Sequence, residues 1–257
     1  FEAHPSVHGE VLIGADGVHS RIRAGLFGPD SPVFTGCVAW RGLVPVGELT
    51  PSLRRRVGTN WIGPGAHVVH YPVRRGELLN FVGIVERDDW QVESWTEVGS
   101  VAECACDFSG WHDDVQEIIR KLQQPNKWAL MGRQPLPQWG VGRVTLLGGA
   151  CHPTLPFLAQ GAMMALEDGL VLARCLEAQR DHLSGALQVY EELRKDRTAR
   201  IVRGSTENAK RFHANVLATN EAAQAYVERE WSESSVMARY AWLFEYDATA
   251  VPVAEIA

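Results

Sequence analysis

The 257 residues, 46% of them hydrophobic, supply enough apolar side chains for one large domain or two. The formal net charge of -6 argues against a nucleic-acid partner, because phosphate backbones bind to basic surfaces. No apolar run approaches the ~20 residues that a membrane span requires, and the chain opens without a basic and apolar leader. The five cysteines lack the spacing of a zinc site, so we expect reduced thiols, no bound metal and a cytoplasmic protein.

The first segment predicts a strand followed by a helix. Residues 11–13 are β-branched and apolar and run into the turn Gly14-Ala15-Asp16-Gly17. Ser20 is a suitable N-cap for a helix over residues 21–26, which Gly28 and Pro29 end. Alone, this pattern indicates only a capped strand-to-helix turn.

The middle of the chain is rich in predicted strands. Residues 38–44, 67–73 and 78–85 are β-rich runs bounded by Gly and Pro, and residues 74–77 read as a hairpin loop. No long helix separates these runs, which favours antiparallel pairing, and a shorter helix is expected over residues 115–122. His67 and His70 lie three apart on one strand and therefore point to opposite faces, so they cannot share a metal ion.

An arginine triplet and a single arginine in this region each allow more than one interpretation. Arg54, Arg55 and Arg56 could bind an anion, but a solvated helix face is the favoured interpretation. Arg41 lies inside an apolar strand, where a charge needs a partner or a function. It could form a structural ion pair, or it could hold an aromatic carboxylate or the edge of a cofactor.

The most informative stretch runs from Val144 to Cys175. Residues 144–147 predict a buried parallel strand that Gly148 and Gly149 end, and a helix is expected from about residue 160 to 178. Its residues 162, 163, 166, 170 and 173 share one small and apolar face, which can press against a sheet or a flat ligand. The proline-containing connection brings the free amides of the helix to the carboxyl end of the strand and so predicts an anion-facing cleft.

Helices are also expected at the end of the chain. A long amphipathic helix is predicted from about residue 184, and residues 221–246 form a helical and aromatic tail. The aromatic side chains favour internal packing. An oligomer contact, such as a homodimer, or a cover over an active site is the alternative.

Two motifs carry a resemblance to a known family. They are Gly14-Ala15-Asp16-Gly17-Val18-His19-Ser20-Arg21-Ile22-Arg23 and Gly148-Gly149-Ala150-Cys151-His152-Pro153-Thr154-Leu155-Pro156-Phe157-Leu158-Ala159-Gln160-Gly161, the second followed by Ala165-Leu166-Glu167-Asp168. Their order and separation resemble the single-component FAD-dependent aromatic hydroxylases, most of all the salicylate hydroxylase branch.

The resemblance implies an α/β fold, in which a partial, three-layer Rossmann-like FAD-binding domain carries an inserted, mostly antiparallel substrate domain and C-terminal helices. Residues 1–32 and 134–180 would belong to the FAD domain, residues 33–133 to the substrate-binding domain and residues 181–257 to the helices.

Two departures from the family pattern matter. Gly149 occupies the position where family members usually carry an Asp that binds the ribityl hydroxyls of FAD, a loss of roughly 1.5–3 kcal/mol if nothing replaces it. The chain also has no Gly-x-Gly-x-x-Gly turn for the FAD pyrophosphate. We therefore expect it to correspond to about the last two-thirds of a typical member.

The resemblance also implies roles for individual residues. The cofactor-binding candidates are Asp16, Gly17, Arg23, Gly148, Gly149, Pro156, Ala159, Gln160 and Gly161. The substrate-site candidates are Arg41, Tyr71, Phe81 and Phe157, of which the aromatic residues, like Trp40, are equally acceptable as core. His152 could assist the deprotonation of a substrate phenol, or it could simply brace the loop by a hydrogen bond. Cys151 could be a reactive thiol, although a small apolar filler is favoured.

The implied reaction is hydroxylation of a phenolic carboxylate such as salicylate. NADH or NADPH would reduce FAD, molecular oxygen would add at flavin C4a, and the resulting hydroperoxide would oxygenate the ring. One alternative is a non-catalytic remnant that binds FAD weakly or not at all. Another is a flavin-dependent dehydrogenase or halogenase, although no motif places a halogenase lysine near the loop.

Overall fold

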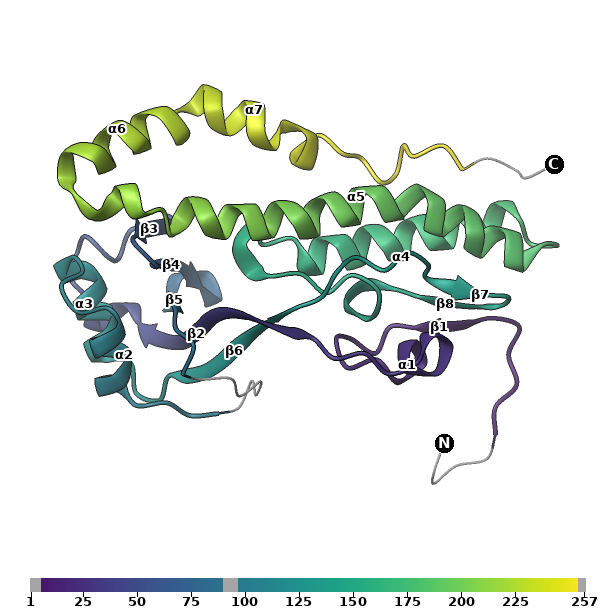
Figure 1. The fold of residues 1–257 in the computed structure, drawn as a ribbon, viewed down its shortest axis with the longest axis horizontal. Helices are drawn as coiled ribbons and strands as arrows, with labels where there is room; N and C mark the ends of the chain where they lie inside the picture. The colour runs from purple at the N-terminus through teal and green to yellow at the C-terminus, as the bar shows by residue number, and fades with distance from the viewer. Residues whose placement is uncertain (1–5, 90–96, 254–257) are drawn as a thin grey trace. The chain divides into compact units, whose positions relative to one another are not determined.

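The computed structural model describes residues 6–89 and 97–253, which form two compact units (Figure 1). Of the described residues, the first unit contains 6–32, 132–208 and 236–253, and the second contains 33–89, 97–131 and 209–235. The C-terminal helices are thus divided between the two units, whereas the sequence grouped them into one part. Among the described residues, every helix is too short or too polar to cross a bilayer.

The first unit contains a small mixed sheet in the order β1-β8-β7. Strand β1 (Leu12–Gly14) pairs in parallel with β8 (Val144–Leu146), and β8 pairs antiparallel with β7 (Gly140–Val141). The parallel pairing confirms the expectation for the strand that opens the second motif. Gly14 has to be small, because a Cβ there would lie 2.7 Å from Leu146 Cδ2 and 2.9 Å from Ile22 Cβ.

Four helices belong wholly or mainly to this unit: α1 (Arg21–Phe27), α4 (Gly161–Ala178), α5 (Leu183–Phe212) and α7 (Glu233–Phe244). The apolar core joins β8 to α4 and α5, which lie alongside each other in Figure 1. It is formed by Trp139, Leu146, Ala150, Cys151, Val171, Leu172, Cys175, Ala186, Leu187, Val189 and Tyr190.

The small and apolar face of α4, which the sequence suggests can press against a sheet or a flat ligand, is open in this structure. Met163, Leu166 and Leu170 are 49%, 68% and 39% exposed, whereas Met164, Val171 and Leu172 are buried. The helix is apolar on more than one side, so the spacing of its apolar residues could not show which side faces the core.

The second unit is built on a five-stranded sheet in the order β3-β4-β5-β2-β6. Its strands are β2 (Val33–Pro45), β3 (Thr59–Gly63), β4 (Ala66–Val73), β5 (Leu78–Glu86) and β6 (Asn126–Gly132). The pairings of β4 with β5 and of β5 with β2 are antiparallel, as expected, and β3 pairs antiparallel with β4. Strands β3 and β6 were missed by the sequence analysis.

One face of this sheet packs on α2 (Val101–Asp107) and α3 (Asp113–Lys121). Side chains on this face include Trp40, Val68 and Phe81, which are fully buried. Directly paired residues share a face, so the registers place Arg41 with Val82 and Val69, and Tyr71 with Asn80, on the opposite face. The 3-10 segment Asn215–Ala218 and α6 (Asn220–Glu230) complete the unit.

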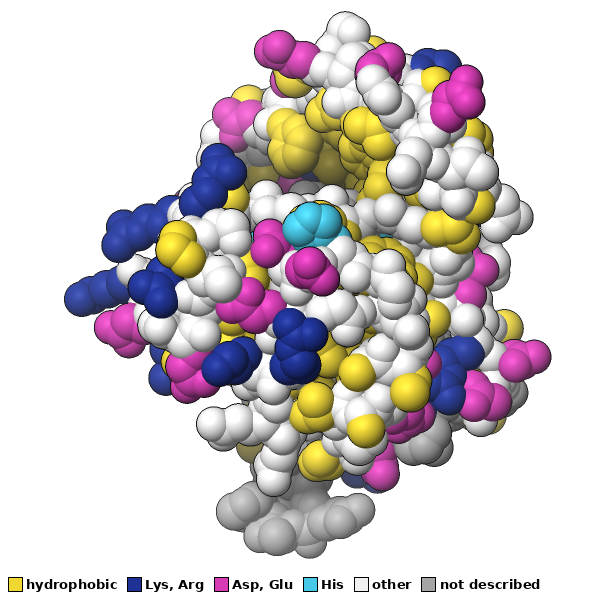
Figure 2. Space-filling view, turned by 90° about the vertical axis from the view of Figure 1, so that its left-hand side faces the viewer, with side chains coloured by type: hydrophobic (Ala, Val, Ile, Leu, Met, Phe, Trp, Pro, Cys, Tyr) yellow, Lys and Arg dark blue, Asp and Glu magenta, His cyan; other side chains and the backbone are white. Residues whose placement is uncertain are grey.

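The arginine triplet does not lie on a helix. Residues 51–56 form turns, in which Arg54 Nε donates to the Leu49 carbonyl at 2.6 Å, while all three arginines are exposed. Lys and Arg side chains gather along one side of the face drawn in Figure 2. The solvated part of the interpretation is confirmed, and the predicted helix is wrong because Arg54 is used to close a turn.

Candidate functional site

The two sequence motifs meet at the carboxyl ends of β1 and β8. Leu147 N donates to the Gly14 carbonyl at 2.9 Å, which continues the parallel pairing into both turns. A Cβ at Gly149 would lie 3.5 Å from Gly17 Cα, so these two glycines face each other at van der Waals distance. The turns after β1 and β8, around Gly17 and Gly149, therefore lie together and form one wall of the candidate site in the first unit.

The first turn is a helix cap. Asp16 Oδ2 accepts hydrogen bonds from Arg21 N at 2.8 Å and Ile22 N at 3.3 Å, and Ser20 Oγ accepts one from Arg23 N at 2.9 Å. Partial burial opposes ionisation of Asp16, but the hydrogen bonds outweigh it and lower its pKa. This geometry confirms the N-cap and accounts for Asp16 without a ligand, so its cofactor role stays a prediction.

Arg23 connects the first turn to the second motif. Its side chain is buried, forms an ion pair with Asp30 and donates to the Ala150 carbonyl at 3.4 Å. Asp30 also pairs with Arg133. Two arginines thus share one carboxylate beneath the loop, and this cluster holds the loop against α1.

The loop between β8 and α4 ends in an open helix N-terminus. Gly148 has φ +61°, and a Cβ there would lie 3.0 Å from Ala165 Cβ, which explains the glycine. Pro156–Leu158 form a 3-10 turn, and Ala159 follows in the left-handed region at φ 54° and ψ 31°. A non-glycine residue in this conformation is uncommon and is often found at functional sites.

No described side chain caps α4, and its first turn carries no acidic residue. Gly161, Ala162 and Met163 are exposed there. The positive end of the helix dipole and the free amides of the first turn are therefore open to an electron-rich group.

A buried ionic network supports this loop from below. His152 Nε2 lies 2.6 Å from Asp168 Oδ2, which also accepts a hydrogen bond from Gly148 N at 3.1 Å, while Arg194 Nε donates to Asp168 Oδ1 at 2.8 Å. Burial opposes ionisation of Asp168, but His152 and Arg194 outweigh it and lower its pKa. The contact of His152 matches the bracing alternative, and its catalytic role stays a prediction.

The network extends from α4 to α5 and the segment after α7. Arg194 also contacts Glu167 at 2.6 Å and the Tyr246 hydroxyl at 2.7 Å, and Arg197 binds Glu167 through two nitrogens. The Arg197 guanidinium carbon lies 3.7 Å from the centre of the Tyr246 ring. Tyr246 of the aromatic tail therefore packs internally within this unit, as the favoured interpretation expected, whereas Phe244 is 72% exposed.

Cys151 is a buried neutral thiol. Burial raises its pKa far above the ordinary value, and the nearby Asp168 carboxylate raises it further. A thiolate is the reactive form, so the structure supports the apolar-filler interpretation. Cys151, His152 and Asp168 could in principle hold a metal ion, but the Arg194 cation already neutralises Asp168.

The substrate-site candidates lie in different surroundings. Arg41 is exposed, donates to Asn80 Oδ1 at 3.4 Å and has no ion-pair partner among the described residues. Tyr71 is 41% exposed on the same sheet face, whereas Phe81 is fully buried against Phe108 on the helix-covered face. Phe157 is buried in the first unit. Phe81 and Trp40 are therefore core residues, which is one of the two roles that the sequence allowed for them.

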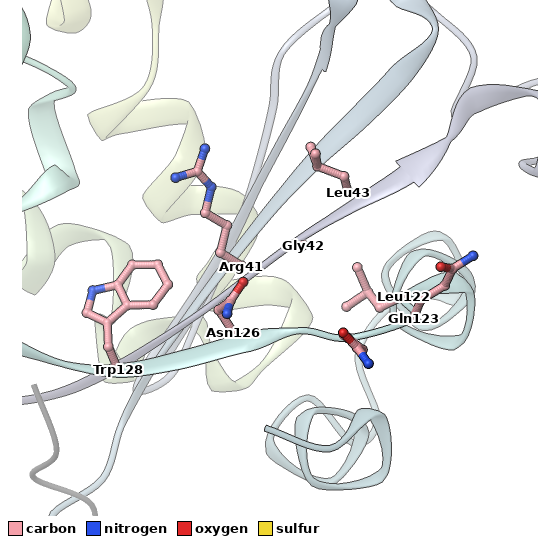
Figure 3. A pocket seen from close by; sticks show the side chains of 8 residues that line it. Arg41, Gly42, Leu43, Leu122, Gln123, Asn126 and Trp128 are labelled. Carbon is pink, nitrogen blue, oxygen red and sulfur yellow. The ribbon is translucent and has the colours of Figure 1, made fainter. Parts of the chain in front are cut away.

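Arg41 also lines a cavity of about 420 Å³ in the second unit (Figure 3). The Trp128 side chain on β6 forms one wall, and Leu122 and Gln123 lie at the other end. The cavity therefore combines a guanidinium, an indole and side-chain amides.

The roles of Arg194 and Glu167 in supporting the loop were not predicted from the sequence. An Arg on an amphipathic helix normally lies on the solvated face. Arg194 reaches Asp168 only because α5 packs against α4 in the folded protein. The one available signal was the charged pair Glu167-Asp168 within an otherwise apolar helix.

The comparisons with known proteins agree with this geometry. The family model described as an FAD binding domain matches residues 2–205, so the chain belongs to that family of flavin-dependent aromatic hydroxylases. A 3-amino-4-hydroxybenzoate 2-monooxygenase of Streptomyces platensis is 36% identical over 241 residues, which cover 94% of this chain and 60% of the relative. A 3-hydroxybenzoate 6-hydroxylase of Polaromonas naphthalenivorans is 40% identical, with 83% and 53% covered.

Solved structures give the same result. A salicylate hydroxylase in complex with substrate has a TM-score of 0.78 at 27% identity and covers 97% of this chain and 66% of its own. Klebsiella pneumoniae HpxO, complexed with FAD and uric acid, has a TM-score of 0.78 at 30% identity, with 92% and 60% covered. These matches confirm the fold class. The chain spans about 60% of the length of the first curated relative.

Proposed function

We propose that the chain forms the flavin-edge and substrate-domain portion of an aromatic hydroxylase. The reaction would hydroxylate a phenolic carboxylate of the salicylate type, with molecular oxygen as co-substrate and NADH or NADPH as reductant. The observation that carries the proposal is the open, uncapped N-terminus of α4 beside the facing glycines Gly17 and Gly149. Relatives named for hydroxybenzoates support a carboxylated phenol.

The residues at this wall fit one part of FAD. Free first-turn amides and a positive helix end suit the N1/O2 edge of an isoalloxazine, where negative charge gathers on reduction. Pro156, Ala159, Gln160 and Gly161 would contact this edge largely through their backbone. When bound, the flavin supplies the redox and oxygen chemistry that side chains cannot.

The chain's own residues would hold and orient the ligands. The buried His152–Asp168–Arg194 network keeps the loop rigid, so the amides of α4 are fixed before a ligand arrives. Arg41 is exposed and bears one hydrogen bond from its guanidinium, which leaves donors for a substrate carboxylate. Tyr71 on the same sheet face would contact the ring.

A non-catalytic flavin-binding remnant is the second candidate, and Gly149 favours it. Gly149 stands where the family usually carries the carboxylate that binds the ribityl hydroxyls. We therefore propose weak FAD binding by this chain alone. Oxygen consumption and product formation with salicylate, measured after FAD titration, distinguish a hydroxylase from this remnant and from a dehydrogenase or halogenase.

The site itself is tested by the substitution Ala162→Asp. A carboxylate in the first turn of α4 should stabilise the helix by about 0.3–1 kcal/mol, because it complements the dipole. The same carboxylate should repel the electron-rich flavin edge and weaken FAD binding. Isothermal titration with FAD and thermal unfolding should therefore change in opposite directions.

Ala162→Asn is the matched control, since it has nearly the same shape and no charge. It should have a smaller effect on both measurements. If Ala162→Asp is more stable and still binds FAD as tightly as the unmodified chain, the flavin does not use this helix end.

A further inference from the structure

Five arginines gather on the second unit. Arg54, Arg55 and Arg56 lie in the turns before β3, and Arg74 and Arg75 lie in the hairpin between β4 and β5. The two segments are in contact, because Arg56 Nη2 donates to the Arg75 carbonyl at 3.3 Å. All five residues are exposed. A chain with a net charge of -6 therefore carries a concentration of positive charge at this surface.

The chain itself does not neutralise these charges. Among residues 6–89 and 97–253, no carboxylate forms an ion pair with any of the five arginines, Glu48 and Glu77 beside them included. Arg54 uses its guanidinium to close a turn, with donors to the carbonyls of Leu49 at 2.6 Å and Gly47 at 3.1 Å. The Arg75 guanidinium has no such partner in the described part of the chain, so its donors are open to a ligand.

Two of the five arginines line a cavity of about 560 Å³. Its walls are formed by Arg56, Pro72, Arg75 and Gly76. A Cβ at Gly76 would lie 3.4 Å from Arg56 Nε, so the Arg56 guanidinium packs directly on the backbone of the hairpin. Arg55, in the same turn as Arg56, is not part of the lining.

The hairpin fixes the point from which Arg75 reaches this cavity. Val73 pairs with Leu78, and Glu77 N donates to the Arg74 carbonyl at 3.2 Å, which closes a tight turn. Arg74 and Arg75 have φ +49° and +59°, in the left-handed region that residues with a Cβ rarely adopt. Such a conformation persists only where the surrounding structure imposes it, and here the pairing of β4 with β5 does so.

Two guanidinium groups around one cavity favour a phosphate over a carboxylate. The planar fork of an arginine binds two oxygens of either group. One fork satisfies the single charge and two oxygens of a carboxylate, whereas a phosphate has a further charge and further oxygens for a second fork. A volume of about 560 Å³ is in the range of small-molecule sites, so it leaves room for the rest of a phosphorylated ligand.

We propose that Arg56 and Arg75 bind a phosphate group of a small molecule in this cavity. This is the anion site that the sequence allowed as the less favoured interpretation of the triplet, narrowed to Arg56 and joined by Arg75. One source of the phosphate is the 2′-phosphate that distinguishes NADPH from NADH, and this source rests on the proposed function. The other is a free phosphate such as pyrophosphate, which does not.

Isothermal titration of the full chain with pyrophosphate at low salt tests the site. Saturable binding of one ligand is expected. Arg56→Gln and Arg75→Gln should each weaken it about 5- to 10-fold, because each removes one charge-assisted contact from an exposed and partly screened position. Arg75→Lys keeps the charge without the fork and should give an intermediate loss. Amide NMR should show shifts at residues 56 and 74–77.

Parallel titrations with NADP+ and NAD+ identify the source of the phosphate. These nucleotides differ only in the 2′-phosphate, so tighter binding of NADP+ that is lost in Arg75→Gln assigns the site to NADPH. Pyrophosphate binding with equal affinities for the two nucleotides assigns it to a free phosphate.

Arg55→Gln is the matched control, since it removes the same charge from the same turn but leaves the cavity lining intact. It should change the affinity by less than about 2-fold. Melting temperatures show whether the variants are folded, and the amide shifts of the unmodified chain decide if they are not. Absence of saturable binding of both pyrophosphate and NADP+, or an equal loss in Arg55→Gln, overturns the proposal. None of these measurements requires FAD, so failure of flavin binding in the Ala162 experiment is a separate result.

Discussion

The substitution Gly149→Asp should increase the affinity of this chain for FAD. Gly149 does not have a positive φ, and the three atoms nearest to a Cβ there would be backbone atoms of Gly17 and Val18 at 3.5–3.7 Å. A side chain can therefore be added without strain. A carboxylate at this wall could accept hydrogen bonds from ribityl hydroxyls, and a charge-assisted bond contributes about 1.5–3 kcal/mol.

That free energy corresponds to an affinity increase of roughly 10- to 100-fold. Flavin fluorescence quenching during titration with FAD measures it, and Gly149→Asn and Gly149→Ala serve as controls for shape and for loss of the glycine. We expect Asp to exceed Asn, and Asn to exceed Ala. Equal affinities for the three variants would refute the assignment of this wall to the ribityl chain.

Three further predictions concern stability and thiol chemistry. Asp168→Asn should cost about 1.5–3 kcal/mol at pH 7, because Arg194 would keep Glu167 but lose its charged hydrogen bond to the fully buried Asp168, and urea unfolding measures this. Folding lowers the pKa of Asp168 below its ordinary value of 3.8, so its contribution to stability is complete above about that pH and is lost as the pH falls through the lowered pKa. The stability difference between the unmodified chain and Asp168→Asn should therefore shrink only in acid. Gly14→Ala should destabilise the protein by about 1–3 kcal/mol, because the added methyl group overpacks the site. The matched variant Gly25→Ala has open space around its Cβ and should stabilise the helix by up to about 1 kcal/mol. Similar melting temperatures for the two variants would contradict this prediction. A thiol reagent should label one cysteine rapidly in the folded protein and five in urea, and Cys106→Ser should abolish the rapid reaction; fast labelling of the buried thiols would show that they are accessible.

Local patterns predicted most of the elements. Alternating β-branched residues predicted β4 and β5 to within one residue of their ends, and Ser20 correctly marked the start of α1. Strand β2 begins five residues before the predicted run at residue 38. These features depend on neighbours in sequence, which is why they can be recognised without a structure. The strands β3 and β6 lack such clear alternation and are defined by their partners in the sheet.

Tertiary contacts were beyond the reach of the sequence. The facing of Gly17 and Gly149 follows from the parallel pairing of β1 with β8, which brings together two motifs that are far apart in the sequence. The role of Arg194 depends on where α5 passes, and no local spacing encodes that. The same limit applies to α4, because its apolar spacing does not show which of its sides packs into the core.

Hydrogen exchange followed by mass spectrometry, with and without excess FAD, tests the central claim most directly. The account predicts slower exchange in the amides of residues 160–163 and in the turn around Gly17 when FAD is present, and no change in α2 or α3. Protection that is absent from the start of α4, at FAD concentrations where the flavin is bound, would contradict the claim that this helix end receives the isoalloxazine.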